Sequence, residues 1–365
     1  MTSFLRRIGI GRILANGRRH FSHGNGEPLR IAYFGSDQFS VAVLDKIVKL
    51  KERDEGYVES VHIVTRSIKP TGRKLKKLVD VPVGSYGTDR GIQVHRAESD
   101  EDIVNIARSH RFNIGIAVSY GKLIPATFID SMRFGGLNVH PSFLPKYSGS
   151  SPIQYALMND DAYTGVTVQT LHPTKFDRGR ILAQSERVCI EDSEDFASLQ
   201  MKLASVGGDL LASCLETRCF EREPAVSTQA LPAFSLARKL NPKHRNIDWS
   251  CSTSRQIKRL RDAVGNLHSF LPFEKSQKGT TVTGYKKVVI NAFEPLDEGD
   301  CPLSAPGQFR LQPDQNYILV KTLDKYLAIT KLTFECCKEE DAKTFMEKLP
   351  KRCGTTVNRF HTGYL

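Results

Sequence analysis

The segment Leu29–Ser40, LRIAYFGSDQFS, decides the fold of this 365-residue chain. Its first six residues are mostly apolar and are followed by Gly35, which predicts a buried parallel strand that turns into a helix near residues 38–50. Strands that alternate with helices indicate an α/β fold with a doubly wound, mostly parallel sheet. Further strands are expected in VHIVT (61–65), FNIGIAV (112–118), GLNVH (136–140), GVTVQTL (165–171) and RILAQSERV (180–188), with a helix over 100–109.

The turn after the first strand, GSDQFS (35–40), contains a single glycine. A dinucleotide-binding domain would carry the pattern G-x-G-x-x-G there, because glycines let the backbone approach a pyrophosphate. The sequence therefore argues against an NAD site. Open α/β sheets can still bind other ligands at the carboxyl ends of their strands.

Residues 1–26 carry five arginines and no acidic residue, and their apolar side chains can share one side of a helix. This is the pattern of a mitochondrial transit peptide, with a cut expected before Ser22 in RRHFS. The alternative is a basic arm that binds RNA. We therefore expect a protein of the mitochondrial matrix. Without those arginines the formal charge of +12 falls to about +7 (12 − 5), so the rest of the chain is basic as well.

The length allows two domains. We place a catalytic domain at 27–214, a polar linker at 215–235 and a C-terminal domain at 236–365. In the C-terminal part, Thr253 and Gln256 form the capping box of a predicted helix, and short β-rich segments with turn signals predict a small, OB-like β-barrel. The chain has no run of 18 apolar residues, so we expect no membrane-spanning helix.

Metal binding is not expected from the sequence. The eight cysteines all follow position 188, and none forms a Cys-x-x-Cys motif or a Cys/His cluster at metal-ligand spacing. Reduced thiols in a reducing compartment are the simpler interpretation.

Asn138 and His140 stand out because residues i and i+2 of a strand point to the same face. They lie at the carboxyl end of a predicted strand, where His can move a proton and an Asn amide can donate to a developing oxyanion. Asp177, in the turn FDRG, is the best candidate for a group that orients the imidazole. From the spacing alone, a polar strand end without a catalytic role remains open.

The segment GLNVHPSFLPKYSGSSPIQYALMNDDAYTGVTVQTL (136–171), followed by FDRG (176–179), closely resembles the folate-dependent formyltransferases. The hallmark of that family is Asn-x-His, then Ser-Leu-Leu-Pro, then a distant Asp-x-Gly. LRIAYFGSDQFS, VSYGKLIP (118–125) and NIDWSCSTSRQIKRLRDA (246–263) extend the resemblance from about Leu29 to Val264.

The resemblance implies a formyltransferase-like variant of the Rossmann fold and 10-formyltetrahydrofolate as the formyl donor, without a metal. Asn138 would stabilise the oxyanion of the tetrahedral intermediate, His140 would help to carry the amine proton towards the leaving folate nitrogen, and Asp177 would orient His140 or a bound water. The loop SFLP would line the folate site, through Ser142, Phe143, Leu144 and Pro145.

The sequence departs from the family pattern at several points. Phe143 replaces the usual Leu, and KYSG (146–149) stands where many members have Arg-Trp-Arg-Gly. Arg178 and Arg180 flank the predicted catalytic carboxylate, and the approach LHPTKFD is one residue longer than usual. These differences concern substrate affinity more than the type of reaction.

The acceptor is indicated by two basic regions. RSIKPTGRKLKK (66–77) holds six cations and no acid, and its Pro-x-Gly-Arg core resembles the tRNA-gripping insertion of the family. Residues 236–290 contain 12 Lys/Arg against 3 Asp/Glu. Two cationic regions suit a polyanion. The predicted tRNA contacts are Arg73, Lys76 and Lys77 in the first region and Arg255, Lys258, Arg259 and Arg261 in the second.

The resemblance, together with the two basic regions, implies an enzyme that formylates the α-amine of initiator methionyl-tRNA for mitochondrial translation. We expect a monomer with no membrane partner. Two other functions remain open. One is formyl transfer to a small amine, such as an amino sugar nucleotide or glycinamide ribonucleotide. The other is RNA binding without catalysis on the same scaffold.

Overall fold

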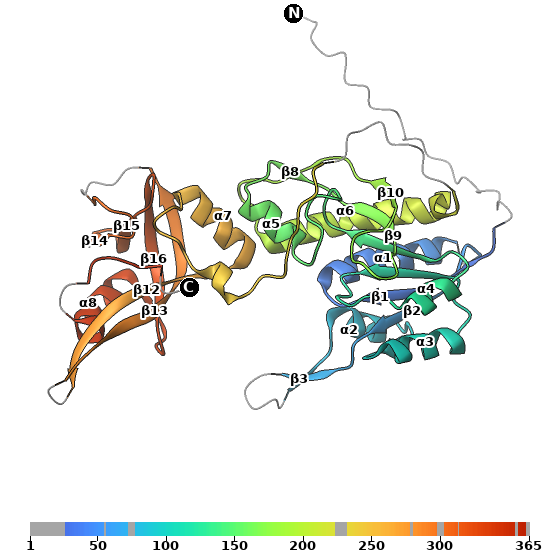
Figure 1. Cartoon of the computed structure of the whole chain (residues 1–365), viewed down its shortest axis with the longest axis horizontal. Coiled ribbons are helices and arrows are strands. Elements are labelled where there is room, and N and C mark those ends of the chain that lie inside the picture. Colours follow the sequence, from blue (N-terminus) through green and yellow to red (C-terminus); the bar gives the residue numbers. More distant parts are fainter. Residues whose placement is uncertain are drawn as a thin grey trace, which may run out of the picture.

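The computed structural model describes residues 26–54, 56–71, 77–222, 232–277, 280–297, 303–312, 314–354 and 357–362. They form two domains that lie side by side (Figure 1). The larger, N-terminal domain is coloured blue to yellow-green, and the smaller, C-terminal domain is orange to red. Among the described residues no helix is long and apolar enough to cross a membrane.

The N-terminal domain is built on a seven-stranded sheet with the order β10-β9-β7-β6-β1-β2-β5. The parallel strands of this sheet are β1, β2, β5, β6 and β7, whereas β9 and β10 are antiparallel to their neighbours. The predicted doubly wound, mostly parallel sheet is confirmed. Its strands are β1 (Leu29–Gly35), β2 (Val58–Thr65), β5 (Val94–Arg96), β6 (Ile114–Val118), β7 (Gly136–His140), β9 (Thr167–Thr170) and β10 (Ile181–Gln184).

Six helices accompany this sheet among the described residues. Asp37 starts α1 by accepting a hydrogen bond from Ser40 N at 3.0 Å. α1 and α6 pack against each other over one face of the sheet, and α3 and α4 contribute to a second core on the other face. The helices are α1 (Gln38–Arg53), α2 (Pro82–Asp89), α3 (Asp100–Ser109), α4 (Ala126–Ser131), α5 (Pro152–Met158) and α6 (Phe196–Thr217).

The segment RILAQSERV does not form one strand as predicted. Its first part is β10, whereas its last residue begins β11 (Val188–Cys189), which pairs with β8 (Tyr163–Thr164) in a separate two-stranded sheet. The break falls at Ser185, whose side chain accepts a hydrogen bond from Val166 N at 2.9 Å while its own N–H donates to Val166 O.

The predicted linker (215–235) overlaps regular structure at its start, because α6 continues to Thr217 and a short 3-10 helix, η2 (Cys219–Glu221), follows. Residues 223–231 lie outside the described part. Residues 232–240 return to the N-terminal domain, where Ser148 N donates to Ser235 O at 2.9 Å and Ala237 N donates to Ser148 O at 2.8 Å. The chain is therefore anchored beside the KYSG segment before it enters the second domain.

The C-terminal domain is a curled antiparallel sheet that forms a half-barrel, close to the predicted small barrel. The strand order is β12-β13-β16-β15-β14, with β17 on β16. The elements are η3 (Pro242–Arg245), α7 (Ser254–Val264), β12 (Leu267–Gln277), β13 (Thr280–Leu296), β14 (Phe309–Gln312), β15 (Tyr317–Lys321), β16 (Tyr326–Phe334), β17 (Glu339–Asp341) and α8 (Ala342–Cys353). The predicted capping box of α7 is confirmed, since Thr253 and Gln256 bond reciprocally.

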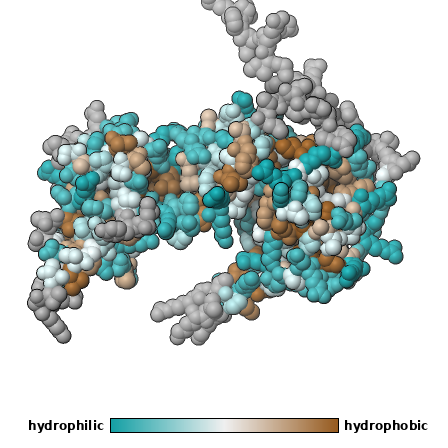
Figure 2. All heavy atoms as spheres, in the orientation of Figure 1, coloured by the Kyte–Doolittle hydropathy of each residue, from teal (hydrophilic) through white to brown (hydrophobic). Residues whose placement is uncertain are grey.

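Two hairpins project to the same side of the molecule (Figure 1). One is formed by β3 (Lys69–Thr71) and β4 (Lys77–Val79) of the N-terminal domain, and the other by β12 and β13. The molecule is hollowed between them (Figure 2). Leu78 is 70% exposed on β4, which is far more exposure than an apolar side chain usually has in a core element.

Candidate active site

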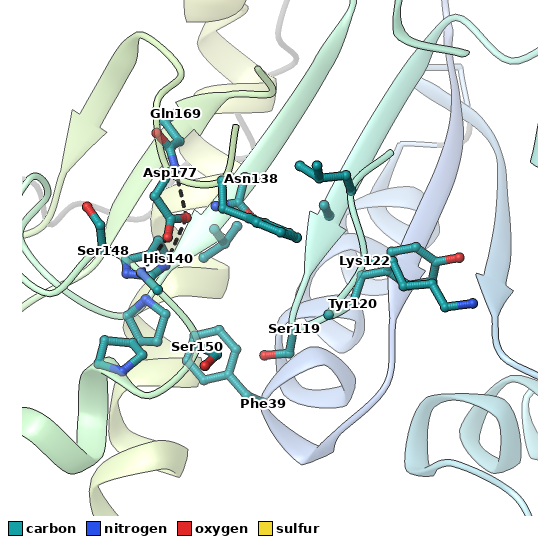
Figure 3. Close-up of a pocket in the computed structure, with 18 of the residues that line it drawn as sticks. Phe39, Ser119, Tyr120, Lys122, Asn138, His140, Ser148, Ser150, Gln169 and Asp177 are labelled. Carbon is teal, nitrogen blue, oxygen red and sulfur yellow. Dashed lines mark hydrogen bonds and ion pairs between the residues drawn. The ribbon is translucent and has the colours of Figure 1, made fainter. Parts of the chain in front are cut away.

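The predicted pair Asn138 and His140 lies at the carboxyl end of β7, in the middle of the sheet. Val139, between them, points into the opposite core and is 2% exposed. Asn138 and His140 therefore share the face that borders a cavity of about 620 Å³. Asp177 lines the same cavity, and Figure 3 shows the three side chains close together on one wall.

Asp177 is held in a tight turn against β9. Gly149 N donates to its Oδ2 at 2.7 Å, and Oδ1 lies 3.4 Å from both His140 Nδ1 and Gln169 Nε2. The turn requires Gly179, because a Cβ atom there would lie 1.6 Å from the carbonyl oxygen of Thr170. The glycine of the Asp-x-Gly motif is therefore needed to place the Asp177 carboxylate beside the His140 imidazole.

Both ring nitrogens of His140 face protein oxygens. Nδ1 faces Asp177, and Nε2 lies 2.9 Å from the carbonyl oxygen of Tyr147. A neutral imidazole has one N–H, so it can donate to only one of these oxygens, whereas a protonated ring donates to both. The arrangement is suited to a histidine that gains and loses a proton in place.

The KYSG departure from the family pattern builds part of this arrangement. Tyr147 is 4% exposed, and its hydroxyl donates to Asp161 Oδ2 at 2.9 Å. Lys146 Nζ binds the same carboxylate at 2.7 Å and lies 4.7 Å from the centre of the Tyr147 ring. Lys146 and Tyr147 therefore fix the carbonyl that faces His140 and do not project into the cavity.

Gln169 was not predicted from the sequence as a site residue. It is the partner of Asn138 in the β7–β9 register and is 1% exposed. Its Nε2 donates to Asp177, while Oε1 has no hydrogen-bond partner among the described residues. Leaving a buried acceptor unpaired costs about 1–3 kcal/mol.

The opposite wall comes from the turns after β1 and β6. Figure 3 places Ser119, Tyr120 and Lys122 there, across the cavity from Asn138. Burial raises the pKa of Asp37, which also lines this wall, and raises the pKa of Tyr120 to about 12. The sequence signals for this wall are the family-like segments LRIAYFGSDQFS and VSYGKLIP, neither of which predicts a role for a particular residue.

Comparison with known proteins identifies the family. Residues 29–215 match the formyl transferase family, and residues 239–350 match the formyl transferase C-terminal domain. The chain belongs to the formyltransferase family. It is therefore an enzyme of formyl transfer, and the resemblance inferred from the sequence is confirmed.

Several relatives share most of this formyltransferase's length. The mitochondrial methionyl-tRNA formyltransferase of Saccharomyces cerevisiae is 30% identical, over 90% of this chain and 91% of the relative. The mitochondrial methionyl-tRNA formyltransferase of Homo sapiens is 28% identical, over 83% of this chain and 73% of the relative. The methionyl-tRNA formyltransferase of Dictyoglomus thermophilum is 32% identical, over 66% and 76%.

Solved structures share the fold at lower sequence identity. An N-formyltransferase from Helicobacter canadensis, bound to folinic acid and dTDP-3-aminofucose, is 17% identical with a TM-score of 0.54, over 82% of this chain and 98% of that one. HypX from Aquifex aeolicus, bound to tetrahydrofolic acid, is 15% identical with a TM-score of 0.52, over 88% and 48%.

The SFLP loop of this formyltransferase lies behind the cavity wall. Thr167 Oγ1 donates to Ser142 O at 2.7 Å and accepts from Leu144 N at 3.1 Å, and Gln184 Nε2 donates to Leu144 O at 3.0 Å. The Phe143 ring covers Gly165 so closely that a Cβ there would lie 2.2 Å from it. Pro141 lines the cavity, whereas residues 142–145 are not among its lining residues, so their folate contacts stay a prediction.

The predicted cations of α7 do not form a free surface. Arg255 Nη2 lies 2.8 Å from Asp192 Oδ1, and Arg259, which is 2% exposed, binds Asp160 Oδ1 at 2.8 Å. Both aspartates belong to the N-terminal domain. These ion pairs differ from the expected exposed cationic face of α7. The helical pattern of the sequence shows which side of α7 is polar, but it does not show that the N-terminal domain contacts that side.

The remaining predicted tRNA contacts are placed as follows. Lys258 Nζ binds Asp262 at 2.7 Å, and Arg261 Nη1 donates to Phe293 O at 2.5 Å. Lys77 begins β4 of the projecting hairpin and is exposed. Arg73 and Lys76 lie outside the described residues.

Proposed function

We propose that this formyltransferase acts in the mitochondrial matrix, as a monomer, and transfers the formyl group of 10-formyltetrahydrofolate to the α-amino group of initiator methionyl-tRNA. The observation that carries the proposal is the placement of Asn138, His140 and Asp177 on one wall of a cavity at the carboxyl end of the sheet. The mitochondrial relatives, which span both domains, support the acceptor and the compartment.

The chemistry begins with attack of the neutral amine on the formyl carbon, which forms a C–N bond and places a negative charge on the formyl oxygen. The Asn138 amide donates a hydrogen bond to that oxygen. Removing one such donor from an enzyme typically lowers kcat by about 10²–10³. Gln169 Nε2 donates to Asp177 and holds this carboxylate beside the reacting groups.

The amine then loses a proton, and the folate N10 gains one as the C–N10 bond breaks. His140 is the group that can hold this proton, because Asp177 on one side and the Tyr147 carbonyl on the other both accept from its ring. Asp177, which borders the cavity, connects the ring to the reacting amine directly or through one water. General acid–base catalysis of this kind contributes about 10²–10⁴ to the rate.

The folate would occupy the cavity between β7 and the turn 119–124. Its volume of about 620 Å³ is in the usual range for a pocket that binds a small organic ligand. Residues 142–145 act in this proposal as the support that fixes Pro141 at the cavity wall. Tyr120 Oη, buried without a partner among the described residues, offers a hydrogen bond to the ligand.

The tRNA would lie in the hollow between the two hairpins (Figure 2). Lys175, Arg238 and Lys239 border the cavity and can neutralise the phosphates of the acceptor end. Phe176 borders the same cavity and is 56% exposed, so its ring can stack on a base, a contact worth about 1–3 kcal/mol. The loop 66–77, with Arg73, Lys76 and Lys77, would grip the acceptor stem.

The deciding experiment offers the purified protein 10-formyltetrahydrofolate together with methionyl-tRNA, glycinamide ribonucleotide or an amino sugar nucleotide. We expect formyl transfer to methionyl-tRNA alone. Formylation of either small amine at a higher kcat/KM would contradict the proposed acceptor. Methionyl-tRNA binding without transfer to any of the three would identify a non-catalytic RNA-binding protein.

A further inference from the structure

Three histidines gather on the side of the N-terminal sheet that carries α3. His62 lies on β2, His95 lies on the neighbouring edge strand β5, and His110 follows the last residue of α3. One ring nitrogen from each of the three lies within 4.8 Å of the others. None of them lines the formyl-transfer cavity. We propose that these three histidines bind one divalent metal ion of the Zn²⁺ class.

The distance between two of the ring nitrogens fits ligands of a single ion. His62 Nδ1 and His95 Nε2 are 3.1 Å apart. In a tetrahedral zinc site with bonds of about 2.0–2.1 Å, two ligand nitrogens are about 3.3 Å apart. A hydrogen bond between these two rings would explain their approach but not the third ring. The centre of the His110 ring lies 4.6 Å from that of His95 and 4.9 Å from that of His62.

The surroundings favour neutral imidazoles, which is the form that binds metals. Partial burial and the neighbouring His110 lower the pKa of His62, and burial with the two other rings lowers the pKa of His95 to about 4. Phe112 packs against His62 and His110 with its ring. In the described part of the chain, no carboxylate forms an ion pair with any of these rings. The cluster is therefore a set of nitrogen ligands and not a salt bridge.

The three rings are half-buried, so one side of the cluster is open to solvent. Three protein ligands and one water make up a common four-coordinate arrangement for zinc. An ion here would tie the edge strand β5, its neighbour β2 and the end of α3 to one another. Because it binds the folded state, it would stabilise the domain without taking part in formyl transfer.

The test uses the full chain, stripped with a chelator and titrated with Co²⁺, whose visible absorption bands report tetrahedral nitrogen ligation. We expect one equivalent to bind, to be displaced by Zn²⁺, and to raise the melting temperature. His62→Gln and His110→Gln should each weaken Co²⁺ binding by about 100-fold or more and abolish the metal-dependent rise in melting temperature. His110 lies after the helix, so its replacement is the variant less expected to disturb folding.

Two controls separate this cluster from other histidines of the chain. His244→Gln changes a half-buried histidine of η3, and the double variant His20→Gln, His23→Gln removes the pair in the first 25 residues. Both should bind Co²⁺ like the wild type. Equal Co²⁺ affinity in the wild type and a natively folded His110→Gln variant would overturn the proposal. So would a wild-type chain that shows no Co²⁺ bands and no change in melting temperature with Zn²⁺.

Discussion

Asp177→Asn is the substitution whose effect can be worked out in most detail. Asparagine has nearly the same size and shape, so one oxygen can still accept the 2.7 Å bond from Gly149 N. The amide NH₂ then replaces the oxygen that lies 3.4 Å from both His140 Nδ1 and Gln169 Nε2. The negative charge beside the imidazole is lost. The new amide NH₂ at position 177 and Gln169 Nε2, which are both donors, then face each other.

The expected loss concerns the step in which His140 holds a proton. General acid–base catalysis contributes about 10²–10⁴ to the rate. The 3.4 Å separation between His140 and Asp177 is longer than a strong hydrogen bond, so we expect the lower end of that range. The prediction is a fall in kcat of about 100-fold, or ~2.7 kcal/mol at 1.36 kcal/mol for each factor of ten. The KM values should change little, because the shape of the wall is kept.

The assay is single-turnover formylation of methionyl-tRNA with saturating 10-formyltetrahydrofolate, followed over pH 6–9. Asp130→Asn is the matched control, since Asp130 is an exposed aspartate on α4 that undergoes the same chemical change. Circular dichroism checks that both variants are folded. An Asp177→Asn enzyme that retains more than about a fifth of the wild-type rate would refute the assigned role.

Four other changes test separate parts of the molecule. Asn138→Ala should lower kcat by about 10²–10³ while tRNA binding, measured by filter retention, persists. Gln169→Met should lower kcat about tenfold but keep or raise the melting temperature, because it removes the Nε2 donor that holds Asp177 together with a buried unpaired oxygen. Replacing the three predicted tRNA-binding cations of the 66–77 loop by serine should reduce the salt dependence of tRNA binding by about two to three units of log–log slope and leave folate affinity unchanged. The hydrogen bond from Arg352 lowers the pKa of Glu340 from 4.5 to about 2. The ionised Glu340 carboxylate therefore stabilises the folded protein fully above pH 4.5, and this contribution disappears as the pH falls towards 2. Chemical denaturation should accordingly show Glu340→Gln less stable than the wild type at pH 7, with the difference shrinking at pH 3.

The fold was largely predictable because local apolar patterns determine it. The buried strands at 29–34, 112–118 and 136–140 are read from short apolar runs, and the rule that ligands meet the carboxyl ends of parallel strands brings Asn138 and His140 to the site. Asp177 was also within reach of sequence reasoning, since a turn that needs Gly179 precedes a strand.

The rest depends on pairings between distant segments. Gln169 reaches the site only because β9 is antiparallel to β7 in one particular register. The histidine cluster joins residues 33 and 15 positions apart in the sequence, a spacing that matches no metal motif. The burial of Arg259 depends on aspartates 99 and 67 residues away in the sequence, so a helical pattern could not reveal it.

The contacts of Arg259 explain how the two domains keep a fixed relation. Its guanidinium is almost fully buried and reaches Asp160 at 2.8 Å and Asp192 at 3.4 Å, so both charges of the N-terminal domain hold α7 in place. Arg259 is buried but the Asp160 and Asp192 side chains are 35% and 75% exposed, so water weakens these pairs relative to a fully buried ion pair. The β12–β13 hairpin begins three residues after α7 ends, so its direction follows that of the helix. Arg255 and Arg259, two of the predicted tRNA contacts, therefore help to keep both hairpins on one side of the molecule, where the tRNA is proposed to bind.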